Sequence, residues 1–256
     1  APLVVIWGEE TYRDDIDIKP TEFYTRLETA KTMPSTSQAT IKDFKEMYDR
    51  LHAEGYEILS ILISEKLSGT ISSAEQAKKM VPDATIEIFN SESTAMTLGF
   101  QALAAARVAN EGGDMAACKA AAEGVRARSG VIFAVDTLEF LHRGGRIGGA
   151  SRFLGTALKL KPLLEVTGGV IEPVDKVRTT RKAHARLIEV IAERTAGKKN
   201  IRLATLHANV KDAADRVLDD ACKYMEVVES IHSEVSPVIG THVGPGTVGL
   251  AYTYDD

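Results

Sequence analysis

The stretch YEILSILISEKLSGTISSAEQAKKM at residues 56–80 decides the fold. Its apolar run at 58–63 follows Gly55 and precedes a polar loop, which is typical of a buried strand. Ser68, Gly69 and Thr70 come next, and residues 70–80 show the spacing of a helix. The sequence therefore predicts a strand, a short loop that contains hydroxyl groups, and the start of a helix.

The start of this helix is a candidate site for a negatively charged group. The first N–H groups of a helix lack intrahelical partners, and together with the helix dipole they favour an anion. Gly69 lets the backbone approach such a group, and the hydroxyls of Ser68 and Thr70 can donate hydrogen bonds to it. We therefore expect a binding site for a carboxylate or a phosphate at the start of this helix. The alternative interpretation is that Ser68 or Thr70 only caps the helix.

Composition excludes several classes of protein. The 256 residues, 44% of them hydrophobic, are enough for one large or two small domains with proper cores. The net charge of −5 argues against a general nucleic-acid binder. Apolar segments are too short to span a bilayer, and residue 1 does not open a signal peptide. Cys118 and Cys222 indicate neither a disulfide framework nor a metal site. We therefore expect a cytoplasmic protein without a bound metal.

The rest of the chain alternates strands and helices. Further strands are predicted at 2–7, 85–89, 131–135, 201–207 and 227–231, with a hairpin over 163–177. Helices are predicted at 21–30, 39–54, 94–110, 115–128, 151–158, 179–195 and 211–222, and residues 31–38 form a loop rich in hydroxyl groups. This alternation predicts an α/β fold with a parallel sheet in its first part. The glycine cluster at 144–149 predicts a change of domain, which gives an N-terminal α/β domain over 1–149 and a C-terminal one over 150–256.

Common catalytic motifs are absent from the sequence. It contains no Walker phosphate loop, Rossmann fingerprint, paired metal-binding histidines or nucleophile elbow. Ser68 and His242 are a conceivable hydrolase pair, but nothing marks an acidic third member. His242 lies in the glycine-rich segment GTHVGPG, where the backbone can approach a ligand, although a structural histidine in a turn explains it equally well. Arg178 precedes a helix start, where a cation gains nothing from the dipole, so it serves either an external partner or a solvated face.

Six motifs together resemble those of the DegV family. They are PSTSQ (34–38), KLSGTISSA (66–74), LEFLHRGGRI (138–147), LKLKPLLEV (158–166), KVRTTRKA (176–183) and SPVIGTHVGPGTVGLAY (236–252). The resemblance covers nearly the whole chain and implies a two-domain α/β fold, with a parallel-sheet N-terminal domain and a mixed or antiparallel C-terminal one. It also implies one long-chain fatty acid bound between the domains and presented to an acyl kinase. Family members usually begin with a strand and an Asp-Ser-Thr type loop that this sequence lacks.

Carried over motif by motif, the resemblance assigns roles to five residues. Thr36 and Ser68 would hydrogen bond the fatty-acid carboxylate, with His242 and Arg146 completing the network. Arg178 would lie on the surface that meets the fatty-acid kinase, and transient contact with a membrane is compatible with this role. Such a protein needs no cofactor and performs no catalysis alone. The alternatives are a stand-alone serine acyl hydrolase that uses Ser68 and His242, and a phosphotransfer or sugar-kinase-like subunit.

Overall fold

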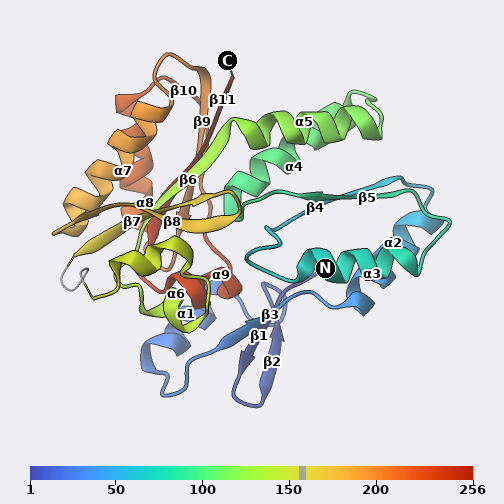
Figure 1. The fold of residues 1–256 in the computed structure, drawn as a ribbon, viewed down its shortest axis with the longest axis horizontal. Coiled ribbons are helices and arrows are strands. Elements are labelled where there is room, and N and C mark those ends of the chain that lie inside the picture. The colour runs from blue at the N-terminus through green and yellow to red at the C-terminus, as the bar shows by residue number, and fades with distance from the viewer. Residues whose placement is uncertain (156–159, 256) are drawn as a thin grey trace.

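Three sheets organise the part of the chain that the computed structural model describes, residues 1–155 and 160–255. The largest has six strands in the order β10-β9-β11-β6-β7-β8, the second has three in the order β2-β1-β3, and the third contains β4 and β5. Figure 1 shows the six-stranded sheet on one side of the molecule and the β4–β5 pair on the other.

The β4–β5 unit is the one predicted from residues 56–80. Strands β4 (Ile58–Leu62) and β5 (Ile86–Asn90) are parallel and are joined through helix α3 (Thr70–Lys79). Helices α2 (Ile41–Ala53) and α3 lie on one side of the pair, and α4 (Ala95–Asn110) and α5 (Met115–Ala127) on the other (Figure 1). Each side has its own apolar core, so β4 and β5 are sandwiched between helices.

The six-stranded sheet is mixed. Its strands are β6 (Ser129–Ala134), β7 (Lys161–Thr167), β8 (Val170–Val177), β9 (Lys199–His207), β10 (Val227–Ile231) and β11 (Val248–Asp255). Only β9 and β10 among these described strands pair in parallel, and the helix that joins them is α8 (Lys211–Tyr224). Helices α7 (Thr180–Arg194) and α8 cover one face of this sheet through an apolar cluster.

The opposite face of the six-stranded sheet packs on the N-terminal segment. There one continuous core includes side chains from β1 (Val4–Trp7), α1 (Pro20–Thr29), α6 (Glu139–Arg143) and α9 (Pro237–Val243). Strand β1 pairs antiparallel with both β2 (Glu10–Arg13) and β3 (Ser35–Ser37). This core therefore joins the first residues of the chain to its last helix.

Two hydrogen bonds connect the β4–α3 loop to the β7–β8 hairpin. Ser64 Oγ donates to the carbonyl of Gly169 at 2.8 Å, and Lys66 Nζ donates to the carbonyl of Gly168 at 2.8 Å. Gly169 has a positive φ of +82°, and a Cβ there would approach Ser64 Oγ to 2.5 Å. The hairpin turn predicted at these glycines therefore connects the six-stranded sheet to the β4–β5 unit, next to the loop that carries Ser68.

The structure corrects three details of the predicted elements. The strand predicted at 131–135 is not part of a parallel series, because β11 returns from the end of the chain and pairs antiparallel with β6. Residues 35–37 of the predicted loop form β3, since their backbone pairs with β1. In place of the helix predicted at 151–158, a 3-10 helix spans Gly148–Phe153, where Gly148 has a φ of +50°. The remainder of that prediction includes 156–159, which lie outside the described residues. The division at residue 149 stays a prediction.

Candidate functional site

The candidate site begins with the placement of α9, which carries His242. Asp14 accepts hydrogen bonds from Ser236 Oγ at 2.6 Å and from Val238 N at 3.0 Å, and so holds the start of this helix. Tyr24 packs beneath α9 so closely that a Cβ at Gly240 would lie 2.3 Å from its hydroxyl oxygen. Two residues from the N-terminal segment therefore fix the position of a helix more than 200 residues later.

His242 faces the short strand β3. Its Nε2 lies 2.7 Å from Thr36 Oγ1, whereas its Nδ1 is buried and has no hydrogen-bond partner among the described residues. Gly144 lies against the same ring, because a Cβ there would come within 2.1 Å of Nδ1. Burial, followed by the positive charge of Arg146, lowers the pKa of His242 to about 4. The imidazole is therefore neutral at pH 7 and carries one proton, so either the Thr36 hydroxyl donates to Nε2 or Nε2–H donates to Thr36 Oγ1. In the second tautomer the hydroxyl hydrogen of Thr36 stays available to a ligand.

Arg146 links the segment after α6 to the Ser68 loop. Its Nε donates to the carbonyl of Leu67 at 3.0 Å, and its Nη1 donates to the carbonyl of Gly144 at 2.7 Å. The guanidinium is thus held by two backbone oxygens, and no carboxylate of the described residues forms a hydrogen bond or ion pair with it. A fixed, unneutralised cation next to a neutral imidazole favours a ligand with negative charge.

Ser68 lies at the start of α3 but does not cap it. The N-cap residue is Gly69, with no side-chain capping hydrogen bond, and Ser68 Oγ lies 2.8 Å from Thr70 Oγ1. A Cβ at Gly69 would meet the Gln38 side chain at 3.1 Å, so the loop packs against the end of PSTSQ. The capping interpretation is wrong for Ser68. Within residues 1–155 and 160–255, Ser68 hydrogen bonds to no histidine or carboxylate.

Two cavities meet at this group of residues. The first, called the inner cavity below, has a volume of about 60 Å³, and Thr36, Ser68, Arg146 and His242 form part of its lining. Its remaining wall is mainly aliphatic, with Leu3, Ile63, Leu67, Leu141, Ile171, Val238, Ile239 and Val243. The outer cavity, about 240 Å³, shares three of the four polar residues and adds Arg143. The structure thus brings all four predicted residues together on the wall of a mainly aliphatic cavity, next to a second cavity that Arg143 and Arg146 line.

Arg178 does not belong to this group. It is exposed between β8 and α7, where Thr179 Oγ1 accepts a hydrogen bond from Lys182 N at 3.3 Å and caps the helix. Ser37, Gln38 and Thr94 also line the inner cavity and were missed by the sequence argument. The first two belong to the PSTSQ motif, which could have indicated them. Thr94 lies at the N-cap of α4 and carries no comparable signal.

Fold and site together define an α/β protein in which hydroxyls, a neutral histidine and an arginine line one part of a mainly apolar cavity. A family model for uncharacterised proteins of the DegV family matches residues 1–255. The protein DegV of Bacillus subtilis is 34% identical over 99% of this chain and 90% of its own length. A DegV domain-containing protein of Halalkalibacterium halodurans is 35% identical over 98% and 89%. The chain belongs to the DegV family.

Solved structures agree with this assignment. A DegV family protein from Thermus thermophilus, described by its fatty acid binding, superimposes with a TM-score of 0.93 at 35% identity, over 99% of this chain and 90% of that one. DegV from Bacillus subtilis, described as a fatty acid binding protein, gives 0.89 at 34% identity, over 100% and 91%. The predicted DegV-like α/β fold is confirmed. No helix in the described part of the chain is long and apolar enough to cross a membrane.

Proposed function

We propose that this protein binds one long-chain fatty acid and presents its carboxylate to a separate acyl kinase. The observation that carries the proposal is the group of Thr36, Ser68, His242 and Arg146 on the wall of a mainly aliphatic cavity. Hydroxyl donors and an arginine suit a carboxylate, and the aliphatic wall suits an acyl chain. The fatty acid binding described for the solved relatives supports the same ligand.

The acyl chain supplies most of the binding free energy. Burying roughly fourteen methylenes at about 0.8 kcal/mol each gives on the order of 11 kcal/mol before costs. A hydrogen bond to a charged carboxylate contributes about 1.5 to 3 kcal/mol. The polar residues therefore determine which way the ligand points more than how tightly it binds.

Binding of a whole long acyl chain requires the inner cavity to widen. A volume of about 60 Å³ has room for only a few water molecules and is too small for a long acyl chain. Leu67 and Ile239 line this cavity at partly buried positions of the core, so they are the side chains we expect to move. We infer that the aliphatic side chains between the sheets separate around the ligand.

The outer cavity gives a partner access to the carboxylate. Thr36, Arg146 and His242 line both cavities, and Arg143 adds a second cation in the outer one. A kinase that docks there would contact the exposed Arg178 of this protein. It would reach the carboxylate without extracting the fatty acid. The phosphoryl-transfer chemistry then resides on the kinase, and this chain supplies binding and orientation.

A serine hydrolase fits the geometry less well. The nucleophile of such an enzyme needs a base within hydrogen-bond reach. The base available here, His242, pairs with Thr36, while Ser68 pairs with Thr70. No feature of the described residues favours a phosphotransfer or sugar-kinase-like role.

The test is native mass spectrometry of the purified protein, followed by lipid extraction. We expect one fatty acid per chain, and we expect added palmitate or oleate to raise the melting temperature of delipidated protein. Ser68→Ala should retain less ligand. If no fatty acid is released and neither addition changes the melting temperature, the proposal is wrong. Covalent labelling of Ser68 by a fluorophosphonate would support the hydrolase instead.

A further inference from the structure

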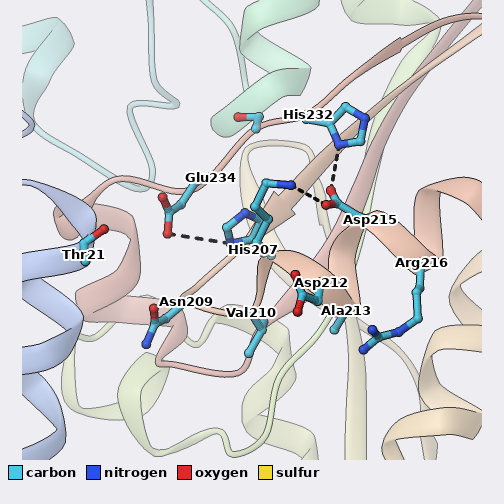
Figure 2. Close-up of a pocket in the computed structure, with 12 residues that line it drawn as sticks. Thr21, His207, Asn209, Val210, Asp212, Ala213, Asp215, Arg216, His232 and Glu234 are labelled. Carbon is cyan, nitrogen blue, oxygen red and sulfur yellow. Dashed lines mark hydrogen bonds and ion pairs between the residues drawn. The ribbon is translucent and has the colours of Figure 1, made fainter.

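A second cleft lies at the carboxyl ends of β9 and β10, and Figure 2 shows the side chains that surround it. Its volume is about 640 Å³, and its lining includes Thr21 of α1, His207, Asn209 and Glu234. None of the four residues proposed to hold the carboxylate lines it. The cleft is therefore a separate place on the molecule.

The cleft belongs to a strand-helix-strand unit. Strands β9 and β10 are parallel and are connected through α8, which starts at Lys211 beside the cleft. In open α/β sheets, ligands bind outside the carboxyl ends of such strands. The N-cap residue of α8, Val210, makes no side-chain capping hydrogen bond, and this helix has 14 residues. Ala213 N already donates to the carbonyl of Val210 at 3.1 Å, so the N–H groups of Lys211 and Asp212 are the donors that remain for an anionic group.

His207 provides an independent indication of a ligand. The residue is 6% exposed and lines the cleft, yet its buried Nδ1 has no hydrogen-bond partner among the described residues. The nearest carboxylate oxygen, Glu234 Oε1, is 3.8 Å away, which is too far for a hydrogen bond (Figure 2). Burial lowers the pKa of His207, so the ring is neutral at pH 7 and offers one donor and one acceptor. An unpaired buried polar atom is costly unless a ligand satisfies it.

The charges around the cleft restrict the chemistry of that ligand. Asp215 is already occupied, because it forms an ion pair with Lys211 and lies 2.7 Å from His232 Nδ1. Around the cleft the cations Lys211 and Arg216 face three carboxylates, which are those of Asp212, Asp215 and Glu234.

A ligand that consists only of an anionic group would therefore lie in a slightly negative environment in this cleft. A bare metal ion lacks a ligand set, since the described residues contain no group of three or more suitable side chains. The ligand that fits combines one anionic group with hydroxyl donors.

We propose that this cleft binds a small molecule that carries a single phosphate and a vicinal diol, such as a nucleoside 5′-monophosphate. The phosphate lies at the start of α8 beside Lys211, and the diol hydrogen bonds to Glu234 and His207. An acidic side chain after the second strand of a strand-helix-strand unit is the group that binds ribose hydroxyls in dinucleotide folds. The loop Ala208–Asn209–Val210 has no glycine. It therefore lacks the close backbone approach that a pyrophosphate needs, which favours one phosphate.

Calorimetric titration of the full chain with 5′-AMP tests the proposal. We expect saturable binding, with inorganic phosphate and adenosine each binding at least tenfold more weakly. Glu234→Gln and Lys211→Ala should each weaken 5′-AMP binding at least fivefold. Asp220→Asn, at the far end of α8, is the matched control and should leave it unchanged. In spectra of the protein with ¹⁵N-labelled histidine, 5′-AMP should shift the signals of His207 and not those of His242.

Two results would overturn the proposal. One is the absence of saturable 5′-AMP binding, and the other is equal affinity for 5′-AMP and inorganic phosphate, or for 5′-AMP and adenosine. Fatty-acid content measured on the same preparation separates this inference from the proposed function. Protein that retains fatty acid but does not bind 5′-AMP contradicts only the cleft, and the reverse result contradicts only the fatty-acid site.

Discussion

Two histidines in different parts of the molecule share an unusual state. His242 in α9 and His207 at the end of β9 each bury an Nδ1 atom that has no hydrogen-bond partner in the described structure, and burial lowers the pKa of both. Their neighbours differ. His242 contacts the Thr36 hydroxyl and lies in the field of Arg146. His207 lies nearest to the carboxylate of Glu234. Burial thus fixes the same neutral ring in two opposite electrostatic settings.

The spaces beside the two rings differ in the same way. The inner cavity at His242 is small, with a mainly aliphatic wall, and adjoins a second cavity lined by Arg143 and Arg146. The cleft at His207 is more than ten times larger in volume, about 640 Å³ against about 60 Å³, and charged side chains line it. The protonation state alone therefore cannot identify a ligand. The neighbours of the ring determine whether an acyl carboxylate or a molecule rich in hydroxyls fits.

Acidification should produce the largest effect and should separate the two histidines. In the unfolded chain His242 takes up a proton near pH 6.5, but in the folded protein only near pH 4. The contribution of neutral His242 to the free energy of unfolding is therefore fully present above pH 6.5. It is lost as the pH falls to 4, and the loss reaches up to about 3 kcal/mol. Urea unfolding at pH 7.5, 6 and 4.5 should show this loss, and His242→Gln should remove most of it.

His207→Gln is the comparison for that experiment. Burial lowers the pKa of His207, but the carboxylates of Glu234 and Asp215 raise it. We therefore expect His207→Gln to remove less of the pH dependence than His242→Gln does. If the two variants remove equal parts, the neighbours do not distinguish the two rings in the way proposed.

Gly144→Ala should be the most damaging single substitution at the fatty-acid site. Its Cβ would lie 2.1 Å from His242 Nδ1 and 3.2 Å from the carbonyl oxygen of Phe140, so the ring must move. Overpacking of this kind costs about 1 to 3 kcal/mol. We expect reduced stability in urea and little retained fatty acid, with 5′-AMP binding unchanged. Gly124→Ala in α5 is the control, because the atom nearest to its Cβ is Arg128 Nη2, at an ordinary 3.5 Å. Normal fatty-acid content in Gly144→Ala would contradict the placement of the carboxylate beside His242.

Thr36→Val should have a smaller effect at the same site. The change keeps the shape of the side chain but removes the hydroxyl 2.7 Å from His242 Nε2. A net hydrogen bond contributes about 1 kcal/mol, so we expect roughly fivefold weaker fatty-acid binding. Competition with a fluorescent fatty acid measures this change. Thr11→Val, on the exposed strand β2 of the same sheet, should bind as the unmodified protein does. Equal affinity of the two variants would remove Thr36 from the site.

The sequence predicted much of the fold because local patterns determine it. The apolar run at 58–63 and the helix after it appear as β4 and α3, and the hairpin appears at Gly168–Gly169. The sheet order was not predictable in the same way. Strand β11 inserts between β6 and β9, and its pairing with β6 joins residues more than 100 positions apart, for which the local sequence carries no signal.

The same distinction applies to the sites. Thr36, Ser68, Arg146 and His242 lie in recognisable motifs, and the structure brings them to one cavity. His207 lies at the end of an apolar strand pattern, where nothing in the sequence marks it. Its environment depends on Glu234, 27 positions later, and on Thr21 from the first helix. A cleft assembled from three distant segments becomes visible only after the chain has folded.

Arg178→Ala should have the smallest effect on the isolated protein and tests the docking surface proposed outside both sites. Arg178 is exposed next to the N-terminus of α7, where a cation is unfavourable with respect to the helix dipole. Its removal should change stability by no more than about 0.5 kcal/mol. Fatty-acid content and 5′-AMP binding should stay unchanged, because Arg178 lines neither cavity nor cleft. Acyl-phosphate formation by an added acyl kinase should slow severalfold, and more at low salt than at high salt, since an exposed interfacial charge mainly affects association.

Lys79→Ala is the matched control for this last experiment, because it removes an exposed cation from the far end of α3 and leaves the α7 surface intact. If both variants slow the kinase equally, the effect reflects net charge and not a contact at Arg178. If Arg178→Ala loses fatty acid while kinase coupling per bound ligand stays normal, Arg178 acts on the ligand site. The docking assignment therefore requires a change that is specific to Arg178, sensitive to salt and confined to the kinase reaction.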